Sequence, residues 1–130
     1  MDRALTPPDA AEWRRRGAWF WAAHDVNAGP VPLALDARGE ALLGDLEISF
    51  CSGAWSAVIL LAWALVEGVE RARAATGDDQ PAMPDVDWLR TQRNALAHGG
   101  AAALDEPALR AAAEGAVRTS FKLLFQAAWR

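Results

Sequence analysis

Residues 48–66 read ISFCSGAWSAVILLAWALV and carry no charged side chain, while Glu47 and Glu67 lie directly at the two ends. The apolar residues fall on every side of a helix rather than on one face, and such a helix must be covered all round. The stretch is also long enough to span a bilayer. Serines and Gly53 dilute its first half, however, and no lysine or arginine cluster flanks it. We therefore expect the central helix of a small bundle and no membrane association.

The rest of the chain has helical character too, because apolar residues recur at spacings of three and four. Asp9, followed three residues later by Glu12, predicts an N-cap with a capping box. Residues 26–39, with two prolines and two glycines, predict a loop or short extended piece. The expected helices run from Pro8 to about Asp25, from Glu40 or Asp45 to Ala75, from Asp85 or Asp87 to the Gly99–Gly100 pair, and from Pro107, capped by Asp105, to near Trp129.

Gly44 and Gly53 are the points where the second of these helices is expected to bend or split. The expected fold is therefore all-α, a small up-and-down bundle of four to five helices, in one domain over residues 1–130. A chain of 130 residues is long enough to build one core without disulfides.

The net charge and the numbers of cysteines and histidines argue against several classes of function. The net charge of −4 argues against coating of nucleic acid by bulk electrostatics, although a local basic site remains allowed. A lone cysteine, Cys51, predicts a reducing, cytoplasmic setting and a buried, unreactive thiol. Two histidines that are far apart, His24 and His98, give no zinc-type spacing, so we expect no metal and no cofactor.

The segment most indicative of chemistry is 85–100, DVDWLRTQRNALAHGG. On a helix at about 100° per residue, Arg90, Asn94 and His98 follow one line at steps of four, and Arg93 falls within the apolar sector. A guanidinium in that sector is costly unless it meets an acidic partner or lines a wet pocket. Histidine transfers protons near neutral pH and arginine offers a planar fork for phosphate oxygens, so the group suits phosphodiester chemistry.

Within this segment, RNALAHG at 93–99 resembles the R-x4-H motif of the HEPN superfamily, in the form with a polar Asn directly after the Arg. The context is similar as well, since a long apolar helix ending in an acidic residue precedes the helix with the motif. The resemblance covers about residues 40–129. It implies a small helical bundle and a metal-independent ribonuclease, such as a toxin of a toxin–antitoxin module or an antiviral defence effector.

The resemblance also implies roles and partners. Arg93 would bind phosphate and stabilise charge at phosphorus, His98 would transfer protons, and Asn94 would orient His98 or hold a phosphate oxygen. Arg90 extends the basic line and is a candidate substrate-binding residue. Attack of the RNA 2′-hydroxyl would leave a 2′,3′-cyclic phosphate, a route closed to DNA. The implied partners are RNA, a second copy that completes the site, and a cognate antitoxin protein.

A second interpretation stays open: a noncatalytic HEPN-like module that binds a protein or nucleotide. In that case Glu67 or Glu70 neutralises Arg93, and His98 only caps the carbonyl end of its helix.

Other residues allow two interpretations each. The run Arg14–Arg16 is a solvated face or an RNA contact, and His24 beside Asp25 is a helix cap or an oriented base. Among the tryptophans, Trp13, Trp55 and Trp63 are expected in the core, and Trp88 and Trp129 at an exposed contact or dimer face.

Overall fold

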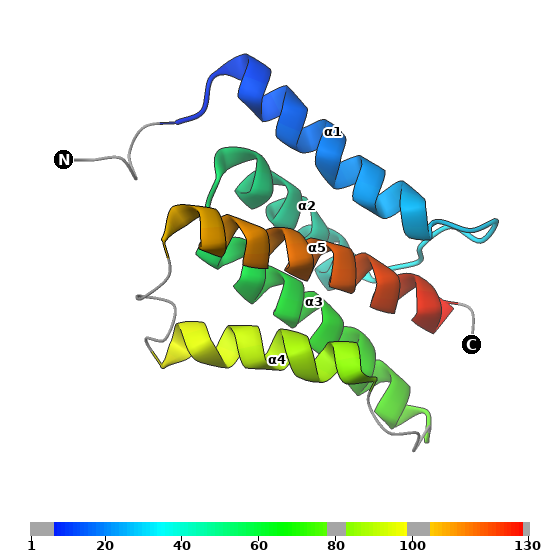
Figure 1. The fold of residues 1–130 in the computed structure, drawn as a ribbon. Helices are drawn as coiled ribbons and strands as arrows, with labels where there is room; N and C mark the ends of the chain where they lie inside the picture. Colours follow the sequence, from blue (N-terminus) through cyan, green and yellow to red (C-terminus); the bar gives the residue numbers. More distant parts are fainter. Residues whose placement is uncertain (1–6, 78–82, 99–104, 129–130) are drawn as a thin grey trace.

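A computed structural model describes residues 7–77, 83–98 and 105–128, with side chains up to Gln126. Consecutive helices alternate in direction along the bundle (Figure 1). This confirms the expected all-α, up-and-down helical bundle, and the described residues contain no strand. The helices are α1 (Ala10–Asn27), α2 (Ala37–Ser52), α3 (Trp55–Ala75), α4 (Pro84–Ala97) and α5 (Glu106–Ala128).

Short polar side chains define where three helices begin. Each of three aspartates accepts a hydrogen bond from the backbone N–H three residues later, which satisfies a donor that the helix itself leaves unpaired. The caps at Asp9 and Asp105 are confirmed, and α4 begins at Pro84, one residue before the expected start. The three bonds are Asp9 to Glu12 at 2.7 Å, Asp36 to Gly39 at 2.7 Å, and Asp105 to Ala108 at 2.9 Å.

The long helix expected up to Ala75 is two helices, divided at Gly53. Gly53 has a φ of 83°, the left-handed conformation that glycine adopts without a steric cost, and it ends α2. Gly44, the other expected break point, lies inside α2 and does not interrupt it. The split turns the apolar segment back on itself, so that α2 and α3 pack together.

The expectation that residues 26–39 form a loop is wrong at its end. Because Asp36 caps the first turn, α2 begins at Ala37 and includes Gly39. Gly39 is buried, and a Cβ there would lie 3.1 Å from the Cβ of Leu35, which explains why a small residue fits inside this turn. The Gly99–Gly100 pair and Trp129 lie outside the described residues.

Helix α3 is the central element, as its apolar pattern predicts. It packs against α2, α4 and α5, whereas α1 packs mainly against α2 and α5 at the edge opposite α4 (Figure 1). Helix α1 therefore contributes little to the cover of the central helix. The buried residues of α3 include Val58, Ile59 and Trp63, which meet Phe50 of α2 and Phe121 of α5 in one core.

In the described part of the chain, no helix combines the length and the apolar character that a membrane crossing requires.

Replacement of Gly53 by alanine should destabilise the fold by about 1–2 kcal/mol, because a side chain disfavours the left-handed conformation. The new Cβ would also lie 2.8 Å from Nη1 of Arg16. Urea unfolding measures the change. Gly44→Ala is the matched control: Gly44 lies inside α2, and a Cβ added there would meet nothing within 4 Å, so alanine should stabilise by about 0.5–1 kcal/mol. Equal stability of Gly53→Ala and the unmodified chain would contradict this account of the turn.

Candidate functional site

Helix α4 carries the residues of the R-x4-H motif on the surface of the bundle. Val86 and Leu89 are buried and fasten α4 to α3 and α5. The motif residues follow in its last turns, with Arg93 and Asn94 half-buried and His98 exposed. His98 is the C-cap, and its backbone N–H donates to the carbonyl of Asn94 at 3.0 Å. The motif thus lies at an accessible helix end, with its imidazole open to solvent.

The guanidinium of Arg93 lies over an indole ring rather than beside a carboxylate. Its Cζ is 5.4 Å from the ring centroid of Trp63, a core residue of α3. The Nε of Arg93 is buried and has no hydrogen-bond partner among the residues that the structure describes. Over the same residues, no carboxylate oxygen lies within 4.0 Å of its guanidinium nitrogens. Arg93 therefore holds a half-buried positive charge that a π-face supports but does not neutralise.

The carboxylates that the noncatalytic interpretation assigns to Arg93 are occupied elsewhere. Glu67 pairs with Arg71 at 3.1 Å, and Glu70 pairs with Arg73 at 2.7 Å, both along α3. The expectation that either glutamate neutralises Arg93 is therefore wrong. Each forms a local pair because residues three or four apart on a helix are neighbours.

Arg90 lies over the same indole but is neutralised. Its Cζ is also 5.4 Å from the Trp63 centroid, and its Nη1 donates to Asp87 at 2.7 Å. Both side chains of this ion pair are exposed. Arg90 is thus less available to a phosphate than Arg93, although both extend from the same helix.

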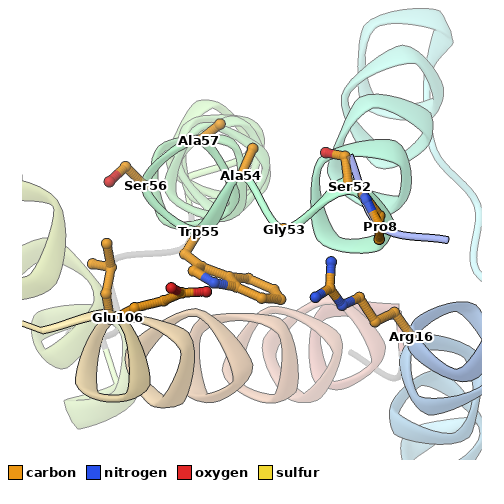
Figure 2. Close-up of a pocket in the computed structure, with 10 residues that line it drawn as sticks. Pro8, Arg16, Ser52, Gly53, Ala54, Trp55, Ser56, Ala57 and Glu106 are labelled. Atoms are coloured by element: carbon orange, nitrogen blue, oxygen red, sulfur yellow. The ribbon is translucent and has the colours of Figure 1, made fainter. Parts of the chain in front are cut away.

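A second cluster, which the sequence analysis missed, lies at the other end of α3. Two guanidiniums lie over the ring of Trp55, with Cζ of Arg16 at 5.0 Å and Cζ of Arg110 at 5.1 Å from its centroid. Figure 2 shows Arg16 and Trp55 together beneath the Gly53 turn. The run of three arginines at 14–16 was an ambiguous signal in the sequence, because successive residues point to different sides of a helix. Only the tertiary fold shows that Arg16 is the one that contacts Trp55.

Glu12 connects the charges of this cluster. Its carboxylate accepts from Arg15 at 2.7 Å and from Arg16 at 3.0 Å, and Arg110 lies 3.8 Å away. The predicted return bond of a capping box is replaced by these contacts. The hydrogen bond from Arg15, followed by the charge of Arg15 and the contacts of Arg16, holds the pKa of Glu12 below its ordinary value.

A cavity of about 510 Å³ lies beside this cluster. The motif residues Arg93, Asn94 and His98 do not line it, so the structure does not bring the two arginine clusters into one site. The cavity lies between α1, the α2–α3 turn and the start of α5 (Figure 2). Its lining residues are Pro8, Arg16, Ser52, Gly53, Ala54, Trp55, Ser56, Ala57, Glu106 and Leu109.

The remaining predictions for aromatic residues have mixed outcomes. Trp55 and Trp63 are in the core as expected, but Trp13 is 40% exposed, although it lies two turns before the buried Phe20 on the same side of α1. Trp88 is partly exposed as expected, and its ring lies close over Gly115 of α5, where a Cβ would come within 2.9 Å. Trp129 lies outside the described residues.

His24 and Cys51, two further candidates from the sequence, lie in surroundings that favour a structural role. The ring of His24 packs edge-on against Phe121 and Phe125, and its Nδ1 lies 2.9 Å from Oδ1 of Asp25. Cys51 is buried, and this burial raises the pKa of its thiol. A buried, protonated thiol is a poor nucleophile.

Among the described residues, no group of three or more histidine, cysteine, aspartate or glutamate side chains is arranged to hold a metal ion.

Comparisons of the chain with models of protein families, with curated proteins and with solved structures find no match. The motif and the surroundings of its residues are therefore the basis on which a function is inferred.

Glu12→Gln should lower stability at neutral pH, because it removes the carboxylate that three arginines surround. A carboxylate whose pKa is lower in the folded than in the unfolded chain stabilises the fold at pH values above its unfolded-state pKa. This contribution to the free energy of unfolding is lost as the pH falls through the folded-state pKa. The stability difference between the unmodified chain and Glu12→Gln should therefore be present at pH 7 and shrink below about pH 4. Urea unfolding at several pH values measures it, with the exposed Asp45→Asn as control. A difference that grows towards acid pH would contradict this account.

Proposed function

We propose that this chain is a HEPN-type, metal-independent endoribonuclease that cleaves RNA by attack of a 2′-hydroxyl on the neighbouring phosphorus. The observation that carries the proposal is Arg93: a half-buried guanidinium inside RNALAHG, with no carboxylate of the described residues within 4.0 Å. The proposed setting is a toxin or an antiviral defence effector held in check by a cognate antitoxin protein.

The position of Arg93 supports an anion-binding role on energetic grounds. Partial burial of an unneutralised charge costs free energy, and such groups occur preferentially at functional sites. The guanidinium presents planar, paired N–H donors that match two oxygens of a phosphate. A phosphodiester bound there would supply both the missing charge and hydrogen-bond acceptors.

His98 and Asn94 supply the rest of the half-site. An exposed imidazole at the end of α4 is accessible to a large substrate and transfers protons near neutral pH. Such general acid–base catalysis contributes about 10²- to 10⁴-fold to a rate. Asn94 lies one helical turn before His98, so its amide is in a position to orient the imidazole or a phosphate oxygen.

The reaction needs one group to take the proton from the 2′-hydroxyl and another to protonate the leaving 5′-oxygen. The chain has only one other histidine, His24, which lies on α1 at the edge of the bundle opposite α4 (Figure 1). His24 is therefore in no position to complete the site of its own chain. We propose that His98 of a second copy does so, which makes the active species a homodimer.

Incubation of the purified protein with total RNA in excess EDTA tests the proposal. Cleavage should survive chelation, and Arg93→Ala and His98→Ala should each lower its rate by about 10²-fold or more, since each removes a group that acts in the transition state. Arg38→Ala is the matched control, because Arg38 is an exposed arginine of α2 and its loss should leave the rate unchanged.

Circular dichroism and thermal unfolding of each variant separate loss of chemistry from loss of fold. Absence of cleavage by folded, dimeric protein would contradict the ribonuclease proposal and favour the noncatalytic binding module. Equal cleavage by the protein and by both variants would contradict the assignment of Arg93 and His98 to the reaction.

A further inference from the structure

Two guanidiniums of α4 lie over the ring of Trp63, and their surroundings differ. Arg90 and Arg93 lie three residues apart on α4, and each Cζ is 5.4 Å from the Trp63 ring centroid. Asp87 bonds Arg90 at 2.7 Å. Arg93 has no carboxylate within 4.0 Å over the described residues, and its Nε is buried without a hydrogen-bond partner there. Of the two cations on this ring, Arg93 is the one whose charge is not compensated.

We propose that Trp63 is a positioning residue: its indole holds the guanidinium of Arg93 in place for a phosphodiester oxygen without neutralising the charge. The identity of the ligand rests on the proposed ribonuclease function. The placement of Arg93 by Trp63 rests only on the geometry.

An indole suits this task better than a carboxylate. The negative face of the ring attracts a cation within about 6 Å, with a strength of about 0.5–2 kcal/mol, and leaves the N–H donors of the guanidinium free. A carboxylate would occupy those donors and compete with the phosphate for them. An arginine that stacks on a ring is therefore ordered before the substrate arrives and still fully charged.

The position of Trp63 in the fold makes it a rigid support. It is 8% exposed and belongs to the core cluster of α3, the helix that α2, α4 and α5 cover. A side chain locked by packing holds a functional group more precisely than one on a loop. The contact also accounts for an arginine in the apolar sector of α4, because the ring covers the face of the guanidinium that turns towards the core.

The test compares Trp63→Leu with Trp63→Phe, both alone and combined with Arg93→Ala, in RNA cleavage. Trp63→Leu should lower kcat by about tenfold, the order of one cation–π contact, and Trp63→Phe should retain most of the activity. In the Arg93→Ala background, Trp63→Leu should have no further effect on kcat, because Arg90, the other cation on this ring, is also held by Asp87. Trp13→Leu, which removes an exposed indole of α1, is the control and should leave kcat unchanged.

A second measurement does not depend on catalysis. The side-chain Nε–Hε resonance of Arg93, assigned from its loss in Arg93→Ala, should show a ring-current shift in the unmodified protein and in Trp63→Phe. Inorganic phosphate should perturb this resonance. If Trp63→Leu fails to fold, the shift in the unmodified chain and the activity of Trp63→Phe decide the matter.

The outcomes separate the two claims. An unshifted Arg93 resonance, or losses from Trp63→Leu that persist in the Arg93→Ala background, would overturn the positioning role while leaving the ribonuclease proposal intact. A shifted, phosphate-responsive resonance in a protein that cleaves no RNA would overturn the ribonuclease proposal and leave Trp63 as the support of an anion-binding arginine.

Discussion

The structure depends on the need to cover an apolar helix on all sides. Helix α3 lies in the middle of the bundle, and α2, α4 and α5 close around it. This arrangement follows from burial of apolar surface, which favours folding by roughly 25 cal/mol per Å². It also fixes the places of the two α3 tryptophans, because Trp55 then lies under α1 and α5 and Trp63 lies under α4. The candidate site is a consequence of how the core is closed.

Arginine–tryptophan packing forms the boundary between this core and the solvent. Guanidiniums lie over three indoles, each at about the distance at which cation–π attraction is effective. Acidic side chains accompany several of these arginines: Glu12 contacts Arg16 and Arg110, and Asp87 contacts Arg90. Over the described residues Arg93 and Arg118 have no such carboxylate, but Arg118 is exposed, whereas Arg93 is half-buried with a buried Nε that lacks a hydrogen-bond partner. This combination distinguishes the candidate site from a structural contact. The pairs are Arg118 on Trp19, Arg16 and Arg110 on Trp55, and Arg90 and Arg93 on Trp63.

Local signals in the sequence predict much of this fold. The aspartate caps at Asp9 and Asp105 and the apolar pattern of α3 depend on residues close in the chain, and those predictions are confirmed. The start of α2 was missed because Gly29, Pro30 and Pro32 before Asp36, together with Gly39 after it, indicated a longer loop. Trp13 was misplaced although it lies on the same side of α1 as the buried Phe20, because the pattern of one helix does not show how far along its length the neighbouring helices cover it.

The sequence also predicts part of the candidate site. A helical wheel is enough to identify Arg93 as an arginine in an apolar sector, which requires a partner. The identity of that partner depends on which α3 residue lies opposite α4, and Trp63 is 30 positions away in the chain. The cluster of Glu12 with Arg110 was missed for the same reason, since it joins α1 to α5. Contacts between distant segments come from the packed fold and leave no local pattern.

The most direct test of the central claim, that the α4 site cleaves RNA through its 2′-hydroxyl, is a single substitution in the substrate. A short RNA that the protein cuts is resynthesised with one 2′-deoxy nucleotide immediately 5′ of the cut. We predict that cleavage at that bond stops, that other cuts in the same molecule continue, and that their products carry 2′,3′-cyclic phosphate and 5′-hydroxyl ends. Continued cleavage at the substituted bond would contradict the account.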